Sequence, residues 1–245
     1  MTTKTQPEIE LAKKIERVLA KASEALGWKL AERLRRQVRL EAAVSSSGGR
    51  DRCERAAVEL DRMAARLGGR SAVARDTLRL AALVRIRGRA SEPREVRDLL
   101  AEMVAALAPA IPYESATAFV YERGSAQLVP VAGQGSHVDL IPDIHFDCGA
   151  GFSSWVAKTR RPVLLSSFRE DPNGVPVVER PASFLSIPVL VDDEVVGVLN
   201  FAHRRPGTFT TADRDLVLLA GRLAAAAFAR EPWTGESSTL VLRSA

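Results

Sequence analysis

The chain has 245 residues, of which 46% are hydrophobic, so it contains enough apolar material for one or two folded domains. No apolar run approaches the roughly 20 residues that span a bilayer, and the charged helix expected directly after the start argues against a signal peptide. The two cysteines, Cys53 and Cys148, lie far apart, so neither a disulfide framework nor a zinc ribbon is expected. A cytoplasmic protein is the prediction.

Charge is distributed unevenly along the chain. Residues 1–90 contain 21 Lys and Arg against 11 Asp and Glu, a net charge of +10, whereas residues 91–245 contain 14 against 19, a net charge of −5. Such asymmetry indicates two units with different partners.

The first unit is predicted to be helical throughout. Apolar residues at three- and four-residue steps predict a long helix over 7–44, on which Glu10 and Lys14, and likewise Glu32 and Arg36, are spaced for ion pairs. The stripe on this helix needs a partner, which is either the following helices or a second copy of the chain.

Two shorter helices follow. The first is predicted over 51–67 and ends at Gly68-Gly69, since glycine favours the position after a helix. The second is predicted over 72–87, with Ser71 as its cap and Gly88 as its end.

This helical hairpin loosely resembles a helix-turn-helix, and its second half faintly resembles ribbon-helix-helix DNA binders. Its arginines would contact phosphates, which gives affinity without sequence readout. Such arginines more often form a solvated helix face, so a DNA-binding regulator is the alternative and not the favoured hypothesis. The residues concerned are Arg66, Arg70, Arg75 and Arg79.

From residue 91 the pattern changes. Ser91 is expected to cap a helix over 93–108, and apolar strands at 115–121 and 127–132 form a hairpin. A strand at 144–147, a helix at 152–159, a strand at 161–165 and a loop at 166–180 come next.

Residues 183–204 predict a second hairpin that turns at Asp192-Asp193, and its arms are so apolar that it belongs in the middle of a sheet. A helix over 210–230, capped by Thr210, and a flexible tail over 231–245 complete the chain. The element order predicts an α+β fold over 91–230 with a central antiparallel sheet, terminal helices on one face and loops on the other, preceded by the all-helical region 1–90.

Four segments of this second unit resemble the GAF domain family, and the resemblance covers roughly residues 92–230. They are a Gly-x-Gly turn that opens a helix and leads to "Val-Ala-x-Thr-x-x-Pro-Val", an Asp-Pro loop, the final hairpin, and a "Phe-Thr-x-x-Asp" helix entry. In this sequence they lie at 149–164, at Arg169-Glu170-Asp171-Pro172, at 186–199 and at 209–216.

The resemblance implies a GAF/PAS-like fold and a module for ligand sensing or dimerisation. It also implies which known subclasses do not fit. No asparagine is followed by lysine, which disfavours the cyclic-nucleotide binders; Cys148 is followed by Gly149, unlike the cysteine of bilin binders. The free methionine sulfoxide reductases need several pocket cysteines, and this domain has only Cys148.

The same region contains residue types that bind metals or take part in catalysis. Asp143, His145 and Asp147 would share one face of a strand and could bind a divalent ion, but the alternation with apolar residues favours a solvated strand face. Gly149-Ala150-Gly151 lacks the Lys-Ser/Thr of a phosphate-binding loop, and no nucleophile-base order stands out. No metal site and no catalysis are predicted.

If a ligand binds, the family's pocket position implies contacts with aromatic and small polar side chains, and no cofactor is identified. The candidate residues are Phe146, Ser153, Trp155, Phe168, Phe184, Ser186 and Asn200.

The prediction is a non-catalytic signalling or regulatory protein that senses a small ligand or binds a partner protein or a second copy of itself through its helices. The alternatives are the DNA-binding regulator and a scaffold with a degenerate, ligandless GAF domain.

Overall fold

The computed structural model describes residues 5–26, 32, 36, 49–68, 71–91, 95–122, 125–135, 145–146, 149–166 and 182–228. The predicted tail at 231–245 and most of the predicted loop at 166–180 lie outside these residues. Among the described helices, none combines the length and the apolarity needed to cross a membrane.

Three helices form the N-terminal region: α1 (Gln6–Leu26), α3 (Gly49–Arg66) and α4 (Ala72–Arg89). The long helix predicted over 7–44 is confirmed as far as Leu26, and Glu32 and Arg36 lie 3.6 Å apart as expected. The pair predicted between Glu10 and Lys14 is not formed. Glu10 instead contacts Arg222 at 2.9 Å, because α1 packs beside the last helix of the chain and presents this carboxylate to it.

The predicted end of α3 and the predicted cap of α4 are confirmed, but the predicted end of α4 is wrong. Gly68 follows α3 with a φ of +73°, the left-handed conformation that glycine adopts readily, and Ser71 Oγ accepts a hydrogen bond from Ala74 N at 3.0 Å. Gly88 does not end α4, which continues to Arg89. A Cβ at Gly88 would lie 2.4 Å from Cys53 Cβ, so this glycine permits the close approach of α3 and α4.

The C-terminal region contains a five-stranded antiparallel sheet in the order β2-β1-β7-β6-β5. Its strands are β1 (Ser115–Glu122), β2 (Gln127–Gly135), β5 (Val163–Leu165), β6 (Ser183–Val191) and β7 (Glu194–His203). A separate two-stranded sheet pairs β3 (His145–Phe146) with β4 (Gly149–Ala150). The α+β class and both predicted hairpins are therefore confirmed.

The hairpin β6–β7 occupies interior positions of the sheet, as its apolar arms predict. Its turn residues Asp192 and Asp193 have φ values of +49° and +64°. Positive φ at both central residues matches the twist of a two-residue hairpin.

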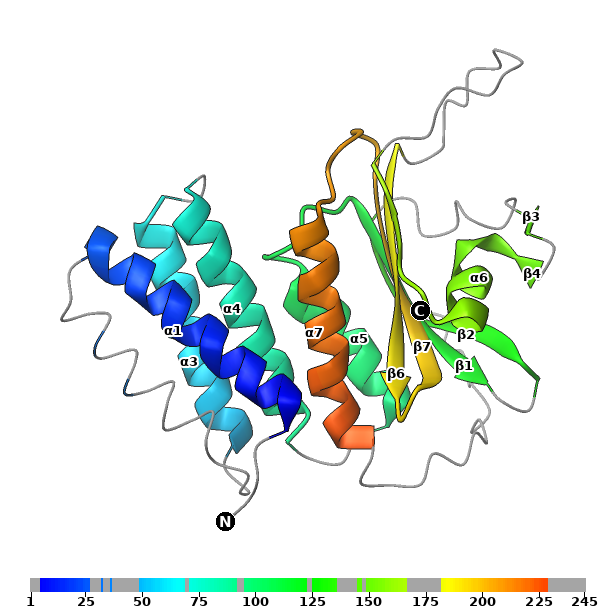
Figure 1. Cartoon of the computed structure of the whole chain (residues 1–245), viewed down its shortest axis with the longest axis horizontal. Coiled ribbons are helices and arrows are strands. Elements are labelled where there is room, and N and C mark those ends of the chain that lie inside the picture. Colours follow the sequence, from blue (N-terminus) through cyan, green and yellow to red (C-terminus); the bar gives the residue numbers. More distant parts are fainter. Residues whose placement is uncertain are drawn as a thin grey trace, which may run out of the picture.

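Helices cover both faces of the sheet (Figure 1). Helices α5 (Val96–Leu107) and α7 (Thr211–Phe228) lie on one face, and α6 (Gly151–Thr159) lies on the other. The N-terminal α1, α3 and α4 pack on the outer side of α5 and α7, so the layers run from helical bundle to helix pair, sheet and α6.

The predicted N-cap of α5 is wrong. Glu95 occupies the N-cap position without a side-chain hydrogen bond, whereas the Ser91 hydroxyl donates to Gly88 O at 2.6 Å. Ser91 therefore belongs to the end of α4, because that helix runs farther than expected and takes up this residue.

One hydrophobic core joins the N-terminal helices to the sheet. Fully buried side chains continue from α1 through α3 and α4 into α5, α7 and the inner face of the strands; examples are Leu19, Leu60, Leu83, Leu100 and Phe201. Ion pairs reinforce the same contacts, including Arg87 with Glu8 at 2.6 Å. The N-terminal helices therefore share one continuous packed core with α7 and the inner face of the sheet.

Candidate ligand-binding site

A row of buried polar residues crosses the middle of the sheet. Asn200 on β7 is the register partner of Thr117 on β1 and of Ser186 on β6. Their exposed fractions are 3%, 6% and 0%. The next residue along each strand belongs to the core shared with α5 and α7, and alternate residues of a strand point to opposite faces. The polar row therefore faces α6.

Helix α6 adds a fourth polar group to this row. Asn200 Nδ2 donates a hydrogen bond to Ser153 Oγ at 2.6 Å, and Ser153 is itself 8% exposed. Gly151, the first residue of α6, has a φ of +77°, so the chain can turn sharply from β4 into the helix. This turn places Ser153 in the first part of the helix, over the centre of the sheet.

Two atoms of the row have no hydrogen-bond partner in the described structure: Ser186 Oγ and Asn200 Oδ1. A buried polar atom without a partner costs about 1–3 kcal/mol, and nearly all such atoms in folded proteins are satisfied. Here two lie on neighbouring strands at paired positions. The arrangement leaves one hydroxyl and one amide oxygen without a partner on the α6 face of the sheet.

Aromatic side chains from the candidate set border the row. Phe184, 1% exposed, packs against Phe152 of α6 with ring centroids 5.4 Å apart. Trp155 is half-buried and packs on the small cluster of Val156, Val195 and Val198 beneath α6. Apolar rings beside a few convergent polar groups are typical of a small-molecule site.

The structure thus brings together Ser153, Phe184, Ser186 and Asn200, with Trp155 on the same helix. Phe146 lies on β3, and Phe168 lies outside the described residues. Asp143, Asp147 and Cys148 also lie outside the described residues. The structure therefore does not test the metal site considered for Asp143, His145 and Asp147.

Thr117 was not among the candidates of the sequence analysis. Its signal was a hydroxyl residue between two alanines of the strand, which becomes informative only when β1 is paired with β7 and Thr117 meets Asn200.

The arginines of the DNA-binding alternative are not equivalent. Arg66 and Arg75 are exposed, and Arg70 lies outside the described residues. Arg79 is engaged inside the molecule, where its Nη2 donates to Asp213 Oδ1 at 2.6 Å. The three described side chains, Arg66, Arg75 and Arg79, therefore do not present one uniform phosphate-binding face.

A five-stranded antiparallel sheet, with paired helices on one face and a short helix over a buried polar row on the other, is the architecture of a GAF/PAS-like sensor-type domain. The model of the GAF domain family matches residues 93–229, which is more than half of the chain. The chain belongs to the GAF domain family. This membership supports a sensor or regulatory role in general.

Solved structures of GAF domains are similar to this chain. The GAF domain of an Acinetobacter phosphoenolpyruvate-protein phosphotransferase is 20% identical and matches with a TM-score of 0.50 over 62% of this chain and 93% of that one. The GAF domain of the phosphoenolpyruvate-protein phosphotransferase from Coxiella burnetii is 22% identical, with a TM-score of 0.47 over 62% and 94% of the two chains.

An enzyme is also among the similar structures. The free methionine-R-sulfoxide reductase of Neisseria meningitidis is 16% identical, with a TM-score of 0.48 over 62% of this chain and 92% of that chain. No curated protein sequence shows a significant match to this chain.

Proposed function

We propose that the protein is a non-catalytic sensor whose GAF domain binds a small organic molecule between α6 and the sheet. The observation that carries the proposal is the pair of unsatisfied buried atoms, Ser186 Oγ and Asn200 Oδ1. A ligand that donates to the amide oxygen and exchanges a hydrogen bond with the hydroxyl would remove the energetic cost of these two unpaired atoms.

The chemistry of the site indicates an uncharged ligand. Among its described residues, those facing the polar row offer hydroxyl, amide and aromatic groups and no ionised side chain: Thr117, Ser153, Phe184, Ser186 and Asn200. A charged ligand would lose its hydration here without an opposite charge to replace it. A small polar molecule with at least one donor and an apolar or aromatic part fits best.

The route to an output runs through the sheet to the helices. The strands that carry Ser186 and Asn200 present their other face to α5 and α7, and α7 contacts α4. Binding that shifts β6 or β7 would therefore change how the N-terminal helices pack. The output in this proposal is the binding of a partner protein or a second copy of the chain in the cytoplasm.

Non-catalytic action is supported by the reactivity of these groups. Hydroxyl and amide side chains bind ligands at neutral pH but need an adjacent base to act as nucleophiles. Of the two cysteines in the chain, Cys53 is 4% exposed and lies between α3 and α4, away from the polar row. Residues 91–230 contain one cysteine, Cys148, so reduction of a sulfoxide with formation of a disulfide inside this domain lacks a second thiol.

The proposal is tested by native mass spectrometry of the freshly purified chain, followed by a screen of uncharged metabolites by thermal shift. We expect a ligand to bind the wild type and to lose about tenfold or more in affinity in Asn200→Leu. Ser183→Ala, on the neighbouring strand β6 and with a satisfied hydroxyl, should bind normally. A ligand that binds Asn200→Leu as well as the wild type would place sensing elsewhere.

A further inference from the structure

A concave region lies outside the GAF sheet, where α1, α4 and α7 meet. It is a cavity of about 210 Å³, well above the roughly 10–15 Å³ that one water molecule requires. Lys14, Arg17 and Lys21 line it from α1, and Arg79 lines it from α4. The first turn of α7 completes the wall with Ala212 and Asp215.

The basic residues of α1 share one helix face. Lys14, Arg17 and Lys21 are separated by three and four positions, the spacing that places side chains above one another on a helix. Lys13, the neighbour of Lys14, is exposed and does not line the cavity. The positive charge is therefore directed toward the cavity by helical geometry and is not spread evenly around α1.

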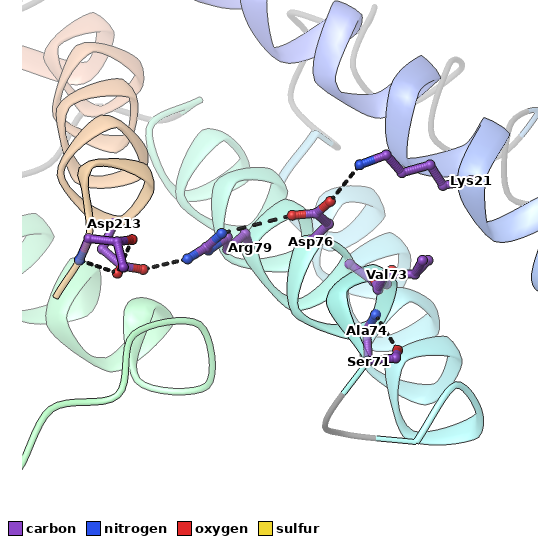
Figure 2. A network of polar contacts seen from close by, with 9 residues as sticks. Lys21, Ser71, Val73, Ala74, Asp76, Arg79 and Asp213 are labelled. Atoms are coloured by element: carbon purple, nitrogen blue, oxygen red, sulfur yellow. Dashed lines mark hydrogen bonds and ion pairs between the residues drawn. The ribbon is translucent and has the colours of Figure 1, made fainter. Parts of the chain in front are cut away.

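The carboxylates at the cavity are already occupied. Figure 2 shows Lys21 Nζ 3.1 Å from Asp76 Oδ2, with Arg79 Nη1 3.8 Å from Asp76 Oδ1. Asp215 accepts from Arg214 Nε and Nη2 at 3.0 Å and 2.8 Å. Every acidic group that lines the cavity thus has a cationic partner.

The cationic side chains at the cavity differ in whether they have an ion-pair partner. Within the described residues, Lys14 and Arg17 have no ion-pair partner although both line the cavity. Arg79 uses Nη2 for Asp213, and its Nε is buried without an acceptor. Four cationic side chains and two carboxylates line the cavity, so it holds an excess of positive charge.

We propose that this cavity is a binding site for a small polyvalent anion that carries phosphate groups. Arginine and lysine are the side chains that bind phosphate oxygens most strongly, and a concave site with cations on two walls contacts several oxygens at once. A molecule held by Lys14 and Arg17 of α1 would lie beside the positive charge of Arg79 on α4, whose own hydrogen bond goes to Asp213. The anion is a second input to the helical region, independent of the uncharged ligand at the α6 site.

An anion at this site would supplement the contacts that already hold α1. In the described structure, α1 is joined to its neighbours by polar contacts at Glu8, Glu10 and Lys21. Lys14 and Arg17 lie between these contacts and line the cavity opposite Arg79 and Asp215. An anion bound there would add a further polar contact at the middle of α1.

The test is isothermal titration of the full chain with pyrophosphate in low-salt buffer, with sodium chloride at equal ionic strength as the reference. We expect saturable binding at one site per chain. Lys14→Gln and Arg17→Gln should each weaken it by about tenfold, because each removes a charge-assisted contact. Both variants should keep the wild-type circular dichroism spectrum, since neither side chain has an ion-pair partner in the described structure to lose.

Lys13→Gln is the matched control, because it removes the same charge one residue away and should change affinity less than about twofold. If Lys13→Gln weakened pyrophosphate binding as much as Lys14→Gln, the proposal would be overturned, because the anion would then respond only to the overall positive charge of α1. Absence of saturable pyrophosphate binding to the wild type would overturn it too. So would binding of a DNA duplex, sensitive to the same variants, without binding of pyrophosphate.

Discussion

Arg79 on α4 and Asp213 on α7 form an ion pair that joins positions 134 residues apart, with Nη2 donating to Oδ1 at 2.6 Å. The other carboxylate oxygen, Oδ2, accepts from Thr210 N at 2.9 Å and from its hydroxyl at 2.7 Å. Asp213 is only 2% exposed. A single buried carboxylate therefore fixes the start of α7 and attaches the N-terminal helices to the GAF domain (Figure 2).

Removal of the cation should be costly. Arg79→Gln leaves Asp213 buried with only the Thr210 hydrogen bonds, and we expect the free energy of unfolding to fall by about 2–4 kcal/mol. Urea denaturation measures the change. Arg75→Gln, one turn earlier at an exposed position, should stay within about 0.5 kcal/mol. Equal effects in the two variants would show that the ion pair contributes nothing specific.

Two serines on β6 provide a test of the unsatisfied hydroxyl. Both Ser183 and Ser186 are 0% exposed, but Ser183 Oγ donates to Leu165 O and accepts from Phe209 N, each at 3.4 Å. Ser183→Ala should lower the unfolding free energy by about 1 kcal/mol, because it leaves those groups unpaired. Ser186→Ala should leave it unchanged or raise it by up to about 1 kcal/mol, because an unsatisfied group is removed.

Thermal and urea denaturation of the ligand-free chain distinguish these outcomes. Destabilisation by Ser186→Ala equal to that by Ser183→Ala would mean that the Ser186 hydroxyl is satisfied in solution. The argument for a ligand at this position would then lose its basis.

The central hairpin could be predicted from sequence because its information is local. Strand-forming apolar arms and a two-residue polar turn at Asp192-Asp193 specify both the pairing and the turn, and interior placement follows from arms that are apolar on both faces. The site was predictable only in part. Ser186 and Asn200 followed from the family resemblance, whereas Thr117 is recognisable only through strand pairing that the sequence does not display.

Two glycines show why some helix ends could not be predicted from the sequence. Gly68 and Gly88 both follow apolar helical segments and both predicted a helix end. Gly68 has a positive φ and confirms the prediction, whereas Gly88 lies inside α4. The difference arises from Cys53, which lies 35 positions earlier and approaches too closely for any Cβ at Gly88. The residues next to Gly88 in the sequence give no indication of this contact.

The two helical glycines Gly88 and Gly221 should respond oppositely to alanine. Gly88→Ala places a Cβ 2.4 Å from Cys53 Cβ, so overpacking should outweigh the helix propensity of alanine and lower stability by about 1–2 kcal/mol. Gly221→Ala meets Val189 at 3.8 Å, an ordinary contact, and should raise stability by about 0.5–1 kcal/mol. Urea denaturation of both variants checks the signs. Stabilisation by Gly88→Ala would show that α3 and α4 can separate at little cost.

Acid should loosen α1 through Glu8. Burial raises the pKa of this carboxyl, but hydrogen bonds from Thr5 N and from Arg87, together with the Arg87 charge, outweigh burial and hold the pKa below its ordinary value of 4.5. Because the folded-state pKa is lowered, the stabilisation is fully present above 4.5 and is lost as the pH falls through the lower folded-state value. Arg87 is then left 7% exposed without its anion.

We therefore expect the unfolding free energy of the wild type to fall between about pH 5 and about pH 3 more steeply than that of Glu8→Gln. The variant should be less stable than the wild type at neutral pH and should approach it in acid, because both then lack the Glu8 charge. Part of the slope should remain in the variant, since Arg204 also holds the pKa of Glu114 below its usual range. Parallel curves for the two proteins would show that the pKa of Glu8 is the same in the folded and unfolded chains, and that its pair with Arg87 does not secure α1.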